Sequence, residues 1–180
     1  MVTSSFTRTD SRPALAAAAP AAAFVAAAGF IVEGVISLVH HTGDDHWDVL
    51  SQVLNAAYAL GAFALIVALP AVGSWLGVNR IGRAGVVAAQ VGCAAMVIES
   101  IVSGFNDGNT LGGLFFGGLL LALVGLLVLG ISGLVAGAVR WAALLPFIGM
   151  FVAIAGGNHG GSIVLGAVWV ILGVAVARRS

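Results

Sequence analysis

Residues 20–48 read PAAAFVAAAGFIVEGVISLVHHTGDDHWD. From Pro20, which suits the first position of a helix, to Val39 the stretch is apolar and carries one ionisable residue, Glu33. A helix needs about 20 such residues to cross the hydrocarbon core of a bilayer. The polar run that follows ends the segment. The stretch therefore predicts one membrane-spanning helix followed by a polar turn.

The composition of the whole chain agrees with that start. Hydrophobic residues make up 61% of the sequence, charged residues only 8%, and the mean hydropathy is +1.13. These values lie outside the range of soluble domains and predict an integral membrane protein whose main partner is the lipid bilayer. The formal net charge is zero, which excludes the basic surface of a nucleic-acid-binding protein. The single cysteine, Cys93, excludes an internal disulfide.

The apolar segments predict an all-α, polytopic six-helix bundle. Residues 1–12 form a polar tail, and residues 13–180 form the transmembrane domain. The apolar run after the tail is too long for a secretory signal, so it counts as the first span. The fourth span is long enough to tilt, or to break near its glycines 130 and 133, and the last two are near the lower length limit. The six expected spans are 20–39, 49–76, 84–105, 111–139, 141–157 and 161–177.

Glycine is abundant, and several glycines are spaced four residues apart. That spacing lets transmembrane helices approach closely, within the bundle or between copies of the chain in an oligomer. The pairs are Gly113/Gly117, Gly133/Gly137, Gly156/Gly160 and Gly157/Gly161.

The arginines predict the orientation, because the chain contains no lysine. In the six-span arrangement all seven arginines fall on one side, which the positive-inside rule assigns to the cytoplasm. Both termini are then cytoplasmic, and the expected location is the plasma membrane. The arginines are Arg8, Arg12, Arg80, Arg83, Arg140, Arg178 and Arg179.

Two acidic residues lie inside predicted spans on the opposite, extracytoplasmic side. Glu33 and Glu99 each precede the end of a span by six residues, a depth of about 10 Å at 1.5 Å per residue. A charged carboxylate at membrane depth costs on the order of 2.5–3.5 kcal/mol, so it normally faces the bundle interior and has a partner or a function. By contrast, the cytoplasmic half is nearly featureless, with Gln90 its only deep amide or ionisable side chain.

Polar residues continue from both carboxylates at helical spacing and form three stripes that could line one pocket open to the exterior. The first two stripes share the pattern ExxxSxx followed by two polar residues, and residues 158–160 echo the second. This pattern suggests three related helical hairpins whose axis would bring Glu33, Glu99 and His159 together. The stripes are Glu33, Ser37, His40 and His41; Glu99, Ser103, Asn106 and Asp107; and Asp48, Gln52 and Asn55.

The favoured function is binding or transforming a small lipophilic ligand in this pocket, and whether the protein is an enzyme stays open. One alternative is acid–base chemistry on an isoprenoid or lipid, as in a terpene cyclase, with Glu33 and Glu99 as proton donor and acceptor. Aromatic side chains could provide the walls of such a pocket. The candidates are Tyr58, Phe105, Phe115, Phe116 and Trp169.

Three further alternatives remain. One is a divalent metal held by His41, His159, Glu33 and Glu99, since imidazole and carboxylate suit several transition metals. Another is coupled transport of an ion or proton, which the featureless inner half disfavours. The last is an accessory protein in which the carboxylates only fix the helix arrangement.

Overall fold

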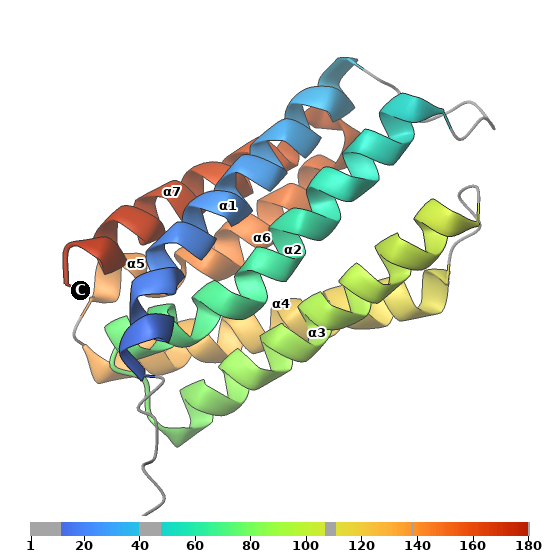
Figure 1. The fold of residues 1–180 in the computed structure, drawn as a ribbon. Coiled ribbons are helices and arrows are strands. Elements are labelled where there is room, and N and C mark those ends of the chain that lie inside the picture. Colours follow the sequence, from blue (N-terminus) through green and yellow to red (C-terminus); the bar gives the residue numbers. More distant parts are fainter. Residues whose placement is uncertain (1–11, 40–47, 107–110, 138, 180) are drawn as a thin grey trace, which may run out of the picture.

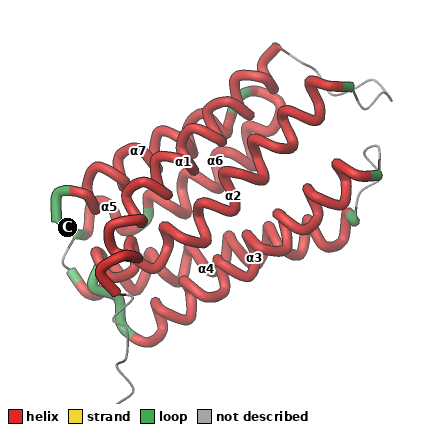
Figure 2. The backbone as a smooth tube through the Cα atoms, in the orientation of Figure 1, coloured by secondary structure: helices red, strands yellow, loops and turns green. Residues whose placement is uncertain are grey.

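The structure is a computed structural model that describes residues 12–39, 48–106, 111–137 and 139–179 (Figure 1). All regular secondary structure in these ranges is helical, as the sequence predicts (Figure 2). The helices are α1 (Arg12–Val39), α2 (Val49–Trp75), α3 (Arg80–Phe105), α4 (Gly112–Ala136), α5 (Arg140–Ala143), α6 (Leu145–Gly156), the 3-10 helix η1 (Gly157–His159) and α7 (Gly161–Ala177).

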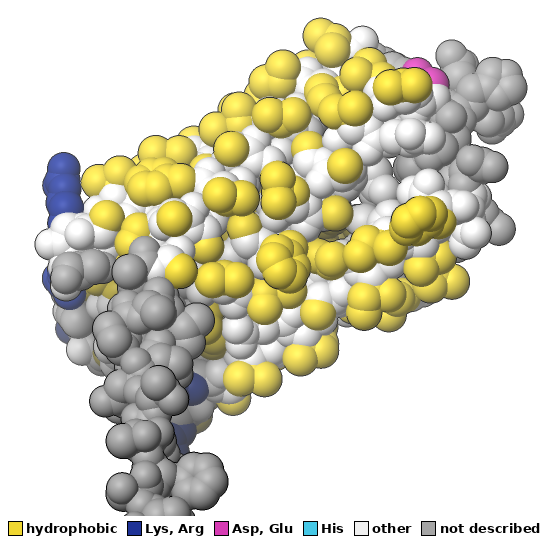
Figure 3. Space-filling view, viewed as in Figure 1, with side chains coloured by type: hydrophobic (Ala, Val, Ile, Leu, Met, Phe, Trp, Pro, Cys, Tyr) yellow, Lys and Arg dark blue, Asp and Glu magenta, His cyan; other side chains and the backbone are white. Residues whose placement is uncertain are grey.

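Length and surface identify a helical membrane protein. Four helices, α1 to α4, are long and apolar enough to cross a bilayer, and two shorter apolar segments follow them. The 27 residues of α2 correspond to about 40 Å, more than the hydrocarbon thickness of about 30 Å. Hydrophobic side chains cover most of the face seen between the two ends of the bundle (Figure 3). The number of spans, six, stays a prediction.

The helices pack as a closed ring in which α1 touches α2, α2 touches α3, α3 touches α4, α4 touches α6, and α6 and α1 both touch α7. The pairs α1–α2, α3–α4 and α6–α7 correspond to the three expected hairpins, whose relatedness stays a prediction. The largest fully buried side chains, including Trp169, Phe30, Leu65, Met96 and Leu126, form the core.

Charge separates the two ends of this bundle (Figure 3). We call the end formed by the α2–α3 turn and the C-terminus the arginine end, because every described arginine lies there. The Trp75 and Trp141 rings meet edge to face at 6.3 Å, and the Arg179 guanidinium lies 5.8 Å from the Trp75 ring centre. Tryptophan favours the membrane–water interface, so we expect the interface at the level of this cluster. The opposite end, which carries Glu33, Asp48 and Glu99, is the acidic end.

Three helix boundaries differ from the sequence prediction by three residues or more. The first helix begins at Arg12 rather than Pro20, so Pro20 lies inside it. The third begins at Arg80 rather than residue 84, because the Asn79 side chain accepts hydrogen bonds from the first amides of α3. The fourth ends at Ala136 rather than residue 139, since Gly137 adopts a left-handed conformation with φ 76° that terminates α4.

Of the two possibilities for the fourth span, the break near Gly130 and Gly133 is wrong, since α4 runs through both, and the tilt stays a prediction. These glycines instead allow other residues to pack closely against α4, since a Cβ atom at Gly130 would lie 2.8 Å from a Leu144 methyl carbon. The interruption occurs in the next segment, between α5 and α6, where Pro146 lies in the first turn of α6. Proline lacks the amide N–H that would continue the preceding helix.

Glycines hold α3 and α4 close together. A Cβ atom at Gly85 would lie 2.7 Å from the Gly125 carbonyl oxygen, and one at Gly118 would lie 2.8 Å from the Gly92 carbonyl oxygen. Real Cβ atoms essentially never come that close, so these positions require glycine. The contacts repeat every seven residues along both helices and let the two backbones touch.

The predicted glycine positions on α4 differ in their surroundings. A Cβ atom at Gly133 would lie 3.2 Å from the Ala143 Cβ, so Gly133 packs closely as expected, whereas one at Gly113 or Gly117 would have no neighbour within 4 Å among the described residues. Both glycines are exposed. An oligomer contact through them stays a prediction.

Gly92→Ala is expected to destabilise the protein, whereas Gly117→Ala is not. The new methyl group at position 92 meets the α4 backbone, and overpacking of this kind costs about 1–3 kcal/mol. At position 117 the methyl group enters open space, and alanine favours helix more than glycine does. Thermal unfolding of both variants in the same detergent checks this. Equal melting temperatures would contradict the α3–α4 packing.

Candidate functional site

Both intramembrane carboxylates lie on the interior faces of their helices. On α1, Glu33 follows the fully buried Phe30 by one turn. On α3, Glu99 follows the fully buried Met96 by one turn, and Glu99 itself is only 5% exposed. Residues three or four apart share a helix face, so both glutamates lie on the faces that contribute to the core, and Glu33 is half-buried there.

Tyr58 of α2 lies between the two carboxylate-bearing helices. Its ring meets Phe30 edge to face at 6.0 Å, and its hydroxyl group donates a hydrogen bond to the Met96 sulfur at 3.0 Å. Both contacts are three residues, about 4.5 Å, deeper than the following glutamate. Glu33 and Glu99 therefore lie at the same level as each other, on the two helices that contact Tyr58 and about one turn above those contacts. Their positions in the sequence predict this equal level.

Aromatic rings lie one turn below the carboxylates. Tyr58 also contacts Phe115 of α4, with ring centres 5.9 Å apart, and Phe115 in turn contacts the exposed Phe116. We call Phe30, Tyr58 and Phe115 the aromatic floor. The faces of such rings carry partial negative charge and attract cations. Of the other expected wall residues, Phe105 is exposed and Trp169 is fully buried in the core, with an indole N–H that has no hydrogen-bond partner among the described residues.

Glu33 contacts the last helix of the bundle. The Ser162 side chain, in the first turn of α7, forms a hydrogen bond with the Glu33 carboxylate. That turn has no side-chain cap of its own, and the partial positive charge of a helix N-terminus favours a nearby carboxylate. The second oxygen, Oε2, is buried and has no hydrogen-bond partner among the described residues. One half of this carboxylate therefore remains available to a ligand or a proton.

Glu99 has a partner on its own helix. The Ser103 hydroxyl group donates a hydrogen bond to Glu99 Oε1 at 2.6 Å, which confirms the expected placement of these two residues on one face. Every described arginine lies at the opposite end, so no described arginine can neutralise either glutamate.

Toward the acidic end α2 and α3 diverge (Figure 1). A groove lies between them, and Ser100, the neighbour of Glu99 in the chain, lines it. Its volume is about 360 Å³. The Asn55 amide bridges the two helices by donating to the Ser100 carbonyl oxygen at 2.7 Å, and the buried Ser100 hydroxyl group has no partner among the described residues. The lining residues are Gln52, Asn55, Ala56, Ala59, Ser100, Ile101, Gly104 and Phe105.

The remaining predicted ligand-binding residues fall in three places. Asp48 is exposed and caps α2, since its carboxylate accepts a hydrogen bond from the Ser51 amide at 2.7 Å. Asn106 is exposed beyond the last residue of α3, and His159 is exposed in η1. The predictions for His40, His41 and Asp107 lie outside the described residues.

The expected convergence on one axis is seen only in part. Helices α1 and α7 bring Glu33 to Ser162, three residues after His159, but α2 separates Glu33 from Glu99. Within the described ranges, no group of three or more His, Cys, Asp or Glu side chains could hold a metal ion. Because His41 is not described, the metal site stays a prediction.

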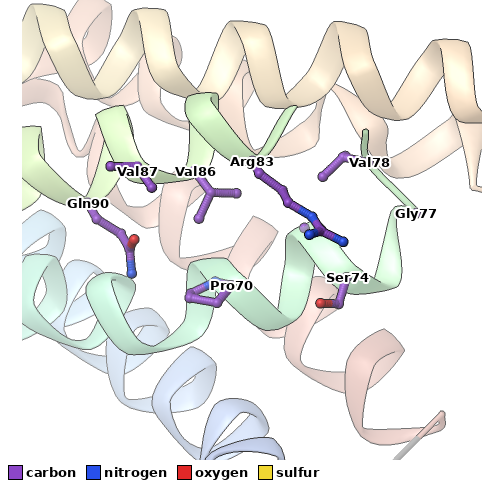
Figure 4. A pocket seen from close by; sticks show the side chains of 9 residues that line it. Pro70, Ser74, Gly77, Val78, Arg83, Val86, Val87 and Gln90 are labelled. Carbon is purple, nitrogen blue, oxygen red and sulfur yellow. The ribbon is translucent and has the colours of Figure 1, made fainter. Parts of the chain in front are cut away.

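A second pocket lies at the arginine end and was not expected from the sequence (Figure 4). Its volume is about 510 Å³, and it lies between the C-terminal part of α2 and the N-terminal part of α3. The sequence feature that could have indicated this pocket is Pro70 with Gly73 and Gly77 near the end of one span, followed by Arg83 in the next. All four of these residues line the pocket.

Gln90 closes the deep end of this second pocket. Pro70 lacks the N–H that would bond the Ile66 carbonyl oxygen within α2. The Gln90 amide of α3 donates to that oxygen instead, at 2.7 Å (Figure 4). The Gln90 side chain therefore replaces the backbone hydrogen bond that Pro70 cannot make within α2.

Comparison of the chain with protein-family models, curated proteins and solved structures finds no match.

Gln90→Leu is expected to lower the unfolding free energy by about 1–3 kcal/mol, because it leaves the Ile66 carbonyl without a partner. In a Pro70→Ala background the helix supplies its own N–H, and the same substitution should cost much less. Thermal unfolding of the two single variants and the double variant measures the coupling. Equal costs in both backgrounds would show that Gln90 does not compensate for Pro70.

Proposed function

We propose that this membrane protein binds a small lipophilic ligand at the acidic end, with Glu33 and Glu99 as polar anchors above the aromatic floor. The observation that carries the proposal is the buried Glu33 Oε2 without a partner among the described residues. A buried, unsatisfied carboxylate oxygen is costly, and a hydrogen-bond donor or a positive charge on a ligand would remove that cost.

The surroundings favour a particular class of ligand. Carboxylates on either side and aromatic rings below suit a lipophilic molecule that carries an amine, a hydroxyl group or a permanent positive charge. The groove between α2 and α3 supports lateral entry from the bilayer, since exposed Ile101 and Phe105 lie beside Asn55 and Ser100 along it.

The aromatic floor also supports a second candidate, acid–base chemistry on an isoprenoid. A protonated Glu33 or Glu99 would transfer its proton to a carbon–carbon double bond, leaving a carboxylate and a carbocation. Phe30, Tyr58 and Phe115 would stabilise the cation until the other carboxylate removes a different proton.

The proposal includes the topology in which the site works. All six apolar helical segments cross the membrane, α5 and α6 together as one interrupted span. The arginine end faces the cytoplasm and the acidic end faces outward. The location is then the plasma membrane.

Glu33→Gln and Glu99→Gln are each expected to lose a co-purifying lipophilic molecule that the wild-type protein retains. Glutamine keeps the shape of the side chain but cannot carry negative charge, so folding and melting temperature should change little. Asp44→Asn, outside the predicted site but next to the acidic end in sequence, provides the control with the same charge change. Native mass spectrometry with elemental analysis on all four proteins makes the comparison and also detects a metal.

Retention of the same adduct in both glutamine variants would contradict the proposed site. Loss from all three variants, including Asp44→Asn, would indicate an effect of overall charge and would also contradict it. Conversion of an added isoprenoid by wild type, and by neither glutamine variant, would favour the second candidate over binding alone.

A further inference from the structure

The pocket at the arginine end combines a cationic mouth with an apolar wall. Arg83 lies one turn inside α3, and its guanidinium group reaches across the pocket toward Ser74 of α2 (Figure 4). Deeper in the pocket the lining is apolar and includes Pro70, Val86 and Val87. Such a lining fits an amphipathic molecule better than a free ion.

No described residue neutralises Arg83. The acidic residues that the structure describes, Glu33, Asp48 and Glu99, all lie at the opposite end of the bundle. The first amides of α3 are already bonded to the Asn79 side chain, so the helix N-terminus is not the binding group here. An anion in this pocket would be held by side chains, above all by the guanidinium group, which binds phosphate oxygens in a bidentate manner.

The depth of the pocket matches the boundary between lipid headgroups and acyl chains. Ser74 precedes Trp75, which belongs to the interfacial tryptophan cluster. Pro70 is four residues, about 6 Å, farther into the hydrocarbon. The pocket therefore extends from the interface to the level at which acyl chains begin.

The pocket also continues onto the lipid-facing surface. Val87 lines it and is 57% exposed, and Val91 continues the same face of α3 one turn deeper at 52% exposure. An acyl chain could follow this face while its headgroup occupies the mouth.

We propose that the pocket between α2 and α3 at the arginine end binds an anionic phospholipid, with its phosphate on Arg83 and Ser74 and an acyl chain along Val87 and Val91. Lysine- and arginine-lined pockets between transmembrane helices are suited to such headgroups, and the leaflet facing the cytoplasm is rich in anionic lipids. This site is separate from the carboxylate site and does not depend on the ligand proposed there, although the leaflet that supplies the lipid follows from the proposed topology.

The test compares lipid binding by the full-length protein and matched variants in a neutral detergent. Phosphatidylglycerol and phosphatidylcholine with identical acyl chains are titrated separately, and bound lipid is counted by native mass spectrometry. Arg83→Gln removes the proposed ligand, and Arg80→Gln removes an arginine at the same end that does not line the pocket. Wild type and Arg80→Gln should prefer phosphatidylglycerol, and Arg83→Gln should bind it about five-fold more weakly.

Three outcomes would overturn the proposal. If Arg83→Gln keeps the preference for phosphatidylglycerol, Arg83 does not bind the phosphate. If Arg80→Gln loses the preference to the same extent, the preference comes from general surface charge. Displacement of phosphatidylglycerol by inorganic phosphate at matched concentration shows that the site takes a free anion. If Arg83→Gln does not fold, Ser74→Phe provides the test, because it blocks the mouth while keeping the charge and should abolish the preference.

Discussion

The absence of water in a bilayer is the constraint on which this structure depends, because every backbone polar group there needs a partner within the protein. The constraint is most visible in α2, where Pro70 frees the Ile66 carbonyl and Gln90 of α3 satisfies it. The same helix pair is joined at the acidic end by Asn55 and Tyr58. These contacts fix α2 against α3, and the two pockets lie at the two ends of that interface.

Tight backbone packing and charge separation follow from the same environment. Without a hydrophobic driving force between helices in lipid, close van der Waals contact between α3 and α4 through Gly92 and Gly118 stabilises their association. Arginine occupies one end, and the described carboxylates occupy the other. Several described polar side chains inside the bundle make a specific hydrogen bond, as Asn55, Gln90 and Ser103 illustrate.

The sequence predicted the helical membrane fold and the equal depth of the two glutamates, because hydropathy and helical spacing are local properties. It did not predict that Asn79 extends α3 or that the chain breaks before Pro146, since both depend on side-chain and backbone detail at helix ends. The pairing of Glu33 with Ser162 joins the first helix to the last and required the tertiary arrangement. The pocket beside Arg83 was missed because its lining, apart from Ser74, Arg83 and Gln90, is apolar or glycine and carries no polar motif.

The arrangement of the acidic end depends on Tyr58 lying between the two carboxylate-bearing helices, and photocrosslinking in membranes probes this position. A photoreactive benzophenone amino acid at position 58 would be irradiated in membranes, and the crosslinked peptides would be identified by mass spectrometry. The structure predicts crosslinks to α1 near Phe30 and to α3 near Met96. Crosslinks to lipid alone, or to neither of these segments, would contradict the arrangement of the site.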